Sequence, residues 1–315
     1  MKTGSDYHEP VLLQDCVDAL RIREGGVYVD VTFGGGGHSR AILDRLGPGG
    51  ALVAFDRDRD AWSQAAKAGF GDGAKNAPKD PRFTLVRGDF RWLKNHLRFL
   101  QKLPVDGLLA DLGVSSHQFD TGARGFSFRF DGPLDMRMDH RARTTAADIV
   151  NRHDEARLAE LLRTYGEVDG AMRVARAIVT SRAARRIATT QDLIAALKPV
   201  TPRRDASGFL AQVFQALRIA VNDELGSLEV LLKQSAEVIR PGGRLVVISY
   251  HSLEDRMVKN WMRSGDLGGE ERKDLYGNRL RPFEPDSNKA TQPSEAEVMR
   301  NPRARSARLR AATRT

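Results

Sequence analysis

The chain has 315 residues, of which 41% are hydrophobic and 29% are charged, a balance typical of a folded globular protein rather than a disordered or fibrous one. Fifty Lys and Arg residues against 41 Asp and Glu residues give a net charge of +9, which favours polyanionic partners. A single cysteine, Cys16, excludes an internal disulfide framework and a multi-cysteine zinc site, and no apolar run reaches the roughly 20 residues that span a bilayer, so we expect a cytoplasmic protein with no membrane segment.

Helices and strands alternate along the first part of the chain. The pattern predicts helices at residues 11–20 and 39–46, and strands at residues 26–33, 51–55, 83–86 and 105–110. Helix-ending turns at residues 47–50 and 240–243 each precede a run of aliphatic residues, and the second run predicts a further strand at residues 244–249. This alternation indicates an α/β fold, in which helices cover both faces of a parallel sheet.

An insertion interrupts this alternation after the fourth strand. About 130 residues separate Leu112 from Gly243, whereas a strand-helix-strand crossover needs on the order of 30. Helices predicted at residues 208–219 and 221–238 account for the crossover itself. The excess, residues 118–205, contains helical patterns at 156–165, 170–184 and 190–197. We therefore expect a small helical domain inserted into a main domain formed by residues 1–117 and 206–315, where it shapes substrate access.

Four consecutive glycines, residues 34–37, lie between the first strand and the following helix. Such a turn lets a ligand approach the bare backbone at the strand ends, where nucleotides bind in open α/β sheets. A dinucleotide fingerprint fits incompletely, because Ser39 stands where its third glycine belongs. S-adenosylmethionine fits better, with Asp30 on the first strand and Asp56 ending the second strand, where its carboxylate can accept ribose hydroxyls. A turn or capping role is the alternative for Asp56.

At several motifs the chain resembles the MraW family of bacterial methyltransferases, which act on the exocyclic N4 amine of a decoding-centre cytidine in small-subunit ribosomal RNA. The motifs lie at residues 8–13, 30–39, 111–116, 124–128, 131–139 and 249–256, and the similarity extends to residues 301–305. The resemblance implies a Rossmann-like S-adenosylmethionine-dependent methyltransferase sheet, with the inserted helical domain recognising the substrate. It implies the small ribosomal subunit RNA as partner and leaves a homodimer open.

The same resemblance implies a set of cofactor residues. Gly36, Gly37 and His38 would contact the methionine end, Asp56 the ribose, Phe90 the adenine, and Asp111 and Gln118 the region around the sulfonium. Three alternatives stay open: a core position for Phe90, a surface position at the helix start for His38, and Asp89 as the acceptor of the adenine amine.

The substrate base needs hydrogen-bond acceptors, because the cytosine N4 amine is a poor nucleophile. Candidates at or just past the predicted strand ends are Asp111, Ser115, Tyr250 and His251, and a structural role is the alternative for each. The Asp/Asn-Pro-Pro-aromatic turn common among amine methyltransferases is absent after the fourth strand, so no general base is assigned. Methylation at cytosine C5 is disfavoured, because it requires a cysteine nucleophile and we expect Cys16 to lie away from the strand ends.

Three further regions are candidates for RNA or metal binding. Residues 124–130 interleave Arg124 and Arg129 with three phenylalanines, which indicates either an RNA-stacking loop or a strand with one buried aromatic face. The arginines of residues 173–186 and of the tail at residues 301–310 either contact RNA or are simply solvated. Asp135 and Asp139 are more typical of pairing with nearby arginines than of a metal site, and we predict no metal.

Two other functions remain open from the sequence. One is methylation of DNA or of a small molecule, and the other is non-catalytic RNA binding that senses a nucleotide. A methyl-transfer assay separates all three functions.

Overall fold

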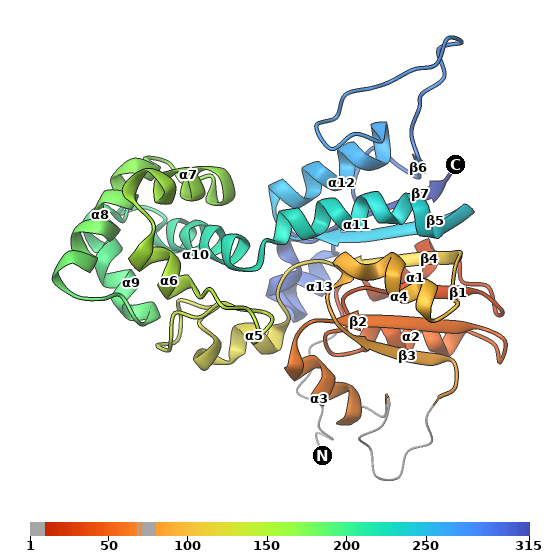
Figure 1. Cartoon of the computed structure of the whole chain (residues 1–315), viewed down its shortest axis with the longest axis horizontal. Coiled ribbons are helices and arrows are strands. Elements are labelled where there is room, and N and C mark those ends of the chain that lie inside the picture. Colours follow the sequence, from red (N-terminus) through yellow and green to blue (C-terminus); the bar gives the residue numbers. More distant parts are fainter. Residues whose placement is uncertain (1–9, 68–69, 71–79) are drawn as a thin grey trace. The chain divides into compact units, whose positions relative to one another are not determined.

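The computed structural model describes residues 10–67, 70 and 80–315 (Figure 1). The chain divides into two compact units. The sheet unit comprises residues Met1–Gly113 and Gly226–Thr315, and the helical unit comprises Val114–Leu225. In the described part of the chain, no helix has the length and apolar character needed to cross a membrane.

The sheet unit contains a seven-stranded sheet in the order β3-β2-β1-β4-β5-β7-β6. The strands are β1 (Val27–Asp30), β2 (Ala51–Asp56), β3 (Phe83–Arg87), β4 (Val105–Asp111), β5 (Ile239–Ser249), β6 (Phe283–Pro285) and β7 (Arg308–Arg314). The first five are parallel, and β7 runs antiparallel to both β5 and β6. The strand order reverses between β1 and β4, so ligands are expected beyond the carboxyl ends of these two strands. The predicted Rossmann-like α/β class is confirmed.

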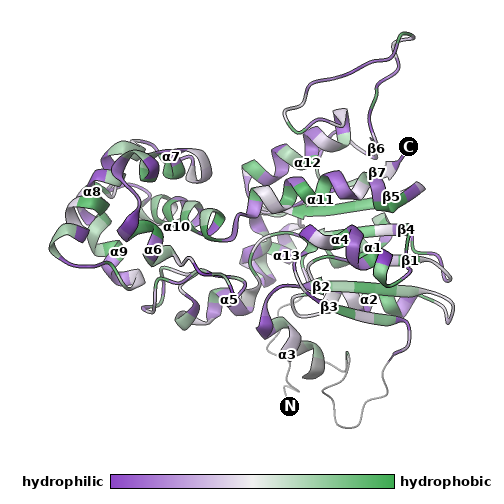
Figure 2. Ribbon diagram, in the orientation of Figure 1, coloured by the Kyte–Doolittle hydropathy of each residue, from purple (hydrophilic) through white to green (hydrophobic). Residues whose placement is uncertain are grey.

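Helices cover both faces of this sheet because the buried strands are apolar on both sides. One face packs against α1 (Leu13–Leu20), α2 (Gly37–Arg45) and α3 (Arg59–Lys67), and the other packs against α4 (Leu93–Phe99), α11 (Glu224–Val238) and α12 (Ser252–Ser264). Strand β4 shows the alternation directly, with Leu108 and Ala110 in one core and Leu109 in the other. Figure 2 shows β5 as hydrophobic along most of its length.

The helical unit has a separate core. Its elements are α5 (Ser116–Asp120), η2 (Gly122–Arg124), α6 (Ala146–Arg152), α7 (Glu155–Gly166), α8 (Ala171–Ala184), α9 (Thr190–Leu197), η3 (Lys198–Val200) and α10 (Ala206–Asn222). Phe209, Val213 and Leu217 of α10 share this core with Leu158 and Leu162 of α7. The predicted boundaries of 118 and 205 therefore differ from those of the structure, which places the unit at Val114–Leu225. Apolar spacing predicts a buried helix face but not the unit into which that face packs.

The basic C-terminal region is part of the sheet rather than a tail. Strand β7 lies between β5 and β6. The remaining short elements of the sheet unit are η1 (Phe90–Trp92), α13 (Glu295–Arg300) and η4 (Pro302–Ser306). Arg308 and Arg310 of β7 pair with Asp255 of α12 at 3.2 and 2.7 Å. The expected solvated or RNA-binding role is thus corrected for Arg310, whose side chain is 10% exposed, whereas the side chain of Arg308 is 50% exposed. The alternation of Arg308, Leu309 and Arg310 with small residues is typical of a half-buried strand.

Candidate active site

The turn after β1 is organised by a buried carboxylate. Asp30 is 1% exposed, and its side chain accepts hydrogen bonds from Ser39 Oγ at 2.6 Å and from the Thr32 backbone N–H at 3.1 Å. Burial raises the pKa of Asp30, although the hydrogen bonds from Ser39 and Thr32 act to lower it. The contact with Ser39 joins the end of β1 to the first turn of α2, so Asp30 shapes the glycine turn.

Two glycines of this turn adopt left-handed backbone conformations, with φ of +51° at Gly34 and +79° at Gly36. A Cβ atom on Gly36 would lie 2.7 Å from Phe33 Cζ, and one on Gly37 would lie 2.1 Å from Pro10 Cγ. Helix α2 begins at Gly37, and among the described residues no side chain caps its N-terminus. Backbone N–H groups at an uncapped helix start favour a carboxylate or another anion.

Asp56 ends β2 and faces the same turn. Its Oδ2 accepts a hydrogen bond from the Gly34 N–H at 2.8 Å, and its Oδ1 accepts one from the Asp58 N–H at 2.8 Å. Burial raises the pKa of Asp56 to about 6. A carboxylate oxygen has two lone pairs, so both oxygens retain acceptor capacity for a hydroxyl pair. The turn-stabilising role and the predicted ribose-binding role are therefore compatible.

The end of β3 carries Asp89 and Phe90. Asp89 caps η1 by accepting from the Arg91 N–H at 2.9 Å, and it pairs with Arg57 at 3.3 Å. Phe90 is half-buried and packs against the core on the α4 face of the sheet. The side chain of Phe90 thus has a structural contact, and the adenine contact stays a prediction.

Asp111, at the end of β4, joins the glycine turn to the end of β5. Its backbone N–H donates to Thr32 Oγ1 at 2.7 Å, and its Oδ1 accepts a hydrogen bond from the Tyr250 hydroxyl at 2.8 Å. Burial raises the pKa of Asp111. Burial and the Asp111 carboxylate together raise the pKa of Tyr250 well above its ordinary range, so the phenol remains a hydrogen-bond donor.

His38 lies beside this pair. It is 6% exposed, its Nε2 is 3.1 Å from the Val11 carbonyl oxygen, and its Nδ1 is 3.7 Å from Asp111 Oδ2. Since a carbonyl oxygen only accepts, Nε2 carries a proton and Nδ1 faces the carboxylate. The alternative of a surface histidine is wrong. The structure thus brings together His38, Asp111 and Tyr250 from three different segments.

His251 stabilises the turn that follows Tyr250. It caps α12 by accepting from the Glu254 N–H at 3.4 Å, and its Nε2 lies 3.2 Å from Glu254 Oε1. Glu254 also accepts from the Tyr250 N–H at 2.9 Å. These contacts give His251 and Glu254 a positioning role for Tyr250. Thr32 and Glu254 were not predicted as site residues, although both lie within the motifs at residues 30–39 and 249–256.

The other predicted residues belong to the helical unit. Ser115 and Gln118 form a capping box on α5, in which the Gln118 N–H donates to Ser115 Oγ at 3.3 Å and the Ser115 N–H donates to Gln118 Oε1 at 3.0 Å. Arg124 is 6% exposed and donates to the Arg137 carbonyl oxygen at 2.9 Å. Arg129 is exposed. The burial of Arg124 favours a structural role for this side chain within its unit.

Arg124 ends η2, and residues 125–130 form a loop rather than a strand. Phe126 is buried and Phe128 packs edge-on against Phe214, with ring centroids 5.6 Å apart, whereas Phe130 is 45% exposed. Asp135 pairs with Arg137 at 2.7 Å, and Asp139 pairs with Arg141 at 2.9 Å. The predicted pairing of these aspartates with arginines is confirmed.

Cys16 of α1 lies in the core on one face of the sheet, in the same cluster as Tyr28 of β1 and Leu109 of β4. Burial raises the pKa of this thiol well above its ordinary value, and the charge of Asp111 raises it further. The side chain is fully buried. The thiol is therefore unsuited to act as a nucleophile, because it is inaccessible and protonated.

A doubly covered sheet with a glycine turn and carboxylates at the ends of β1, β2 and β4 defines a Rossmann-like protein that binds a nucleoside-containing ligand. Comparison with known proteins is more specific. The chain matches the MraW methylase family over residues 5–315 and belongs to this family. The predicted methyltransferase sheet is thereby confirmed. Of the six motifs, only the first extends beyond the described residues, at His8 and Glu9.

Similar proteins cover nearly the whole chain. Three of them, from Bacteroides fragilis strain YCH46, Cytophaga hutchinsonii and Flavobacterium johnsoniae, are named ribosomal RNA small subunit methyltransferase H. The Bacteroides protein is 52% identical over 97% of this chain and 97% of its own length. The Cytophaga protein is 52% identical over 98% and 99%, and the Flavobacterium protein 49% identical over 99% of each chain.

Proposed function

We propose that this protein methylates the exocyclic N4 amine of a cytidine in the decoding region of 16S ribosomal RNA. The observation that carries the proposal is similarity of about 50% over almost the full length to proteins named as small-subunit ribosomal RNA methyltransferases. The chain is a methylase of the MraW family, and S-adenosylmethionine is the methyl donor. A ribosomal RNA substrate implies a cytoplasmic location.

The residues of the sheet unit fit this donor. The uncapped start of α2, at Gly36 and Gly37, suits the carboxylate of the methionine end. Asp56 would accept the two ribose hydroxyls, and Phe90 would cover the adenine, with Asp89 as the alternative contact. His38 would contact the methionine end, and Asp111 would lie toward the sulfonium, the role that the resemblance also gives to Gln118.

The donor supplies an electrophilic methyl group whose transfer to an amine is an in-line displacement. The protein aligns the amine and stabilises the change in charge. We propose that the Asp111 carboxylate accepts a hydrogen bond from the N4 amine of the base. The Tyr250 hydroxyl donates a hydrogen bond to this carboxylate at 2.8 Å and so holds it in position. Ser115, Arg129 and His251 remain candidates for contacts to the RNA. The buried, protonated Cys16 supports amine methylation over ring-carbon methylation.

The test is transfer of a tritiated methyl group to small ribosomal subunits, to naked 16S RNA and to DNA, followed by nucleoside analysis, with binding of donor and RNA measured in parallel. The expected product is N4-methylcytidine in the decoding region. Label on ribose, guanine or cytosine C5 would contradict the substrate assignment. Label on DNA alone would support the DNA methyltransferase alternative, and binding of donor and RNA without transfer would support a non-catalytic role.

A further inference from the structure

A hairpin projects from the sheet unit between α12 and β6 (Figure 1). Its two sides meet at a bridge between Lys273 and Arg279, and the Asp274 N–H donates to the Asn278 carbonyl oxygen at 2.9 Å. The Asp274 carboxylate accepts from the N–H groups of Tyr276 and Asn278, both at 2.8 Å. The tip therefore has a defined shape.

The base of the hairpin is fixed to α12. Asn260 Nδ2 donates to the Leu267 carbonyl oxygen at 3.0 Å, and Arg263 donates to the Gly269 carbonyl oxygen at 3.2 Å. These bonds orient the tip, where the side chain of Tyr276 is 90% exposed and that of Leu275 is fully exposed. An aromatic side chain held in solvent at a structured tip has no role in the core of this unit.

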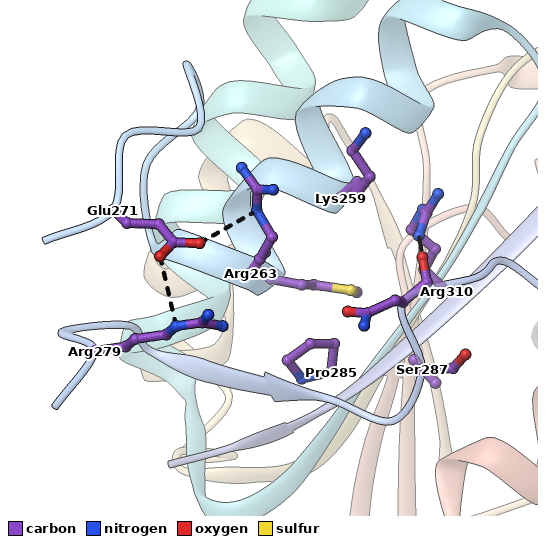
Figure 3. Close-up of a pocket in the computed structure, with 10 residues that line it drawn as sticks. Lys259, Arg263, Glu271, Arg279, Pro285, Ser287 and Arg310 are labelled. Atoms are coloured by element: carbon purple, nitrogen blue, oxygen red, sulfur yellow. Dashed lines mark hydrogen bonds and ion pairs between the residues drawn. The ribbon is translucent and has the colours of Figure 1, made fainter.

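A groove of about 320 Å³ lies at the base of the hairpin, between α12, β6 and β7 (Figure 3). Its cations are Lys259, Arg263, Arg279 and Arg310. Arg310 is neutralised by Asp255, whereas Glu271 is shared by Arg263 at 3.9 Å and Arg279 at 3.5 Å. Within the described residues, no carboxylate pairs with the exposed Lys259. Positive charge therefore exceeds negative charge in the groove.

We propose that this hairpin and groove form a second RNA contact on the sheet unit. An unpaired base stacks on Tyr276, and backbone phosphates contact Lys259 and Arg279. Exposed aromatic rings combined with cations are the means by which proteins hold single-stranded RNA. A protein partner is disfavoured because the adjoining groove carries an excess of positive charge. The inference rests on the proposed function for the choice of RNA as ligand.

The position of the groove suits one continuous substrate. Helix α12 begins two residues after Tyr250, and Lys259 lies eight residues beyond His251. At a rise of 1.5 Å per residue this corresponds to roughly 12 Å along the helix. A few nucleotides of single-stranded RNA span such a distance. The contact would hold nucleotides that neighbour the methylated base.

The test measures binding of a fluorescein-labelled 20-nucleotide oligouridylate to the full-length protein over a range of salt concentrations. Lys259→Ala with Arg279→Ala should weaken binding several-fold and reduce the salt slope by about 1.4, since each lost phosphate contact removes about 0.7 for a single strand. The matched control, Arg23→Ala with Arg98→Ala, removes two exposed cations elsewhere on the unit and should leave both values unchanged. Equal effects of the two double variants would overturn the groove contact.

The aromatic contact is tested separately. Tyr276→Leu should weaken binding about five-fold or more through loss of stacking, whereas Tyr276→Trp should preserve it. Unchanged binding in Tyr276→Leu overturns the stacking role. Impaired methylation of assembled subunits with unchanged RNA binding would instead indicate a protein partner. Binding is measured without methyl transfer, so the two proposals can fail separately. If the wild-type protein binds RNA through these residues but transfers no methyl group, the proposed function is refuted and the RNA contact stands.

Discussion

Asp56 shows how one side chain both organises the fold and prepares a site. Its two oxygens hold the N–H groups of Gly34 and Asp58 and keep lone pairs for a ligand. We expect Asp56→Ala to lower the affinity for S-adenosylmethionine about 100-fold, because each hydrogen bond to a charged group contributes about 1.5–3 kcal/mol. Calorimetric titration measures this affinity. Asp18→Ala, which removes an exposed carboxylate of α1, is the control, and an equal affinity in both variants would exclude Asp56 from the site.

The raised pKa of Asp56 predicts a pH dependence. With a pKa of about 6, the carboxylate is ionised at pH 7.5 and loses its charge as the pH falls below 6. Donor affinity should therefore decrease between pH 7 and pH 5. Folding stability changes in the opposite sense through this group, because the folded protein binds the proton more tightly than the unfolded chain does. Calorimetry at several pH values, compared with Asp56→Asn, checks the first effect; equal pH profiles would contradict it.

Tyr250 is predicted to act through Asp111. Tyr250→Phe removes the 2.8 Å hydrogen bond to the carboxylate and should lower the single-turnover rate of methyl transfer about 5-fold to 30-fold, equivalent to about 1–2 kcal/mol. Donor affinity should change little. The matched control is Tyr276→Phe, which removes a hydroxyl from an exposed ring. If both variants retain the wild-type rate, Tyr250 has no positioning role.

At the scale of elements, the sequence pattern predicts the first five strands and seven of the helices, whereas α3, α4, α6, α12 and β7 are among the elements for which it gives no prediction. Strand β7 illustrates the reason. Burial opposes ionisation of Asp255, but Arg310 and Arg308 hold its pKa below the ordinary value. The sequence signal for a strand at residues 308–314 is weak because arginines occupy the half-buried positions. Their acidic partner lies more than 50 residues away in the chain, and local pattern cannot reveal it.

This ion pair makes β7 sensitive to a single substitution. Arg310→Ala should lower the free energy of unfolding by about 2 kcal/mol, less than for a fully broken buried pair because Arg308 still contacts Asp255. Urea denaturation measures the effect. Arg305→Ala, at an exposed position, should stay within about 0.5 kcal/mol of the wild type. Similar stabilities of the two variants would show that the Arg310 pair does not stabilise β7.

At the scale of the whole molecule, the sequence predicts an insertion from its length but not the edges of that insertion. Helix α10 has an apolar face that either unit could bury, and only tertiary packing assigns it to the helical unit. The candidate site shows the same limit. The glycine turn and the strand-end carboxylates are predictable, because parallel strands bring their ends to one edge of the sheet. The sequence predicts an RNA contact for Arg124, and only the structure reveals the backbone carbonyl to which its side chain donates.

The separate cores predict separable units. Replacing residues 114–225 by a Gly/Ser linker should leave a sheet unit that unfolds cooperatively and binds S-adenosylmethionine within about tenfold of the wild-type affinity, since its buried clusters contain no residue of the helical unit. Methyl transfer to ribosomal RNA should be lost. Circular dichroism, calorimetry and the tritium assay measure these three properties, and a molten or aggregated product would contradict the division.

The discontinuous sheet has a consequence for biosynthesis. Strand β4 pairs on one side with β1 and on the other with β5, yet 127 residues lie between Asp111 and Ile239, the intervening positions 112–238. During translation, the β5-facing edge of β4 stays open while the entire helical unit is produced and folds, which makes it a target for wrong strand pairing or for chaperones.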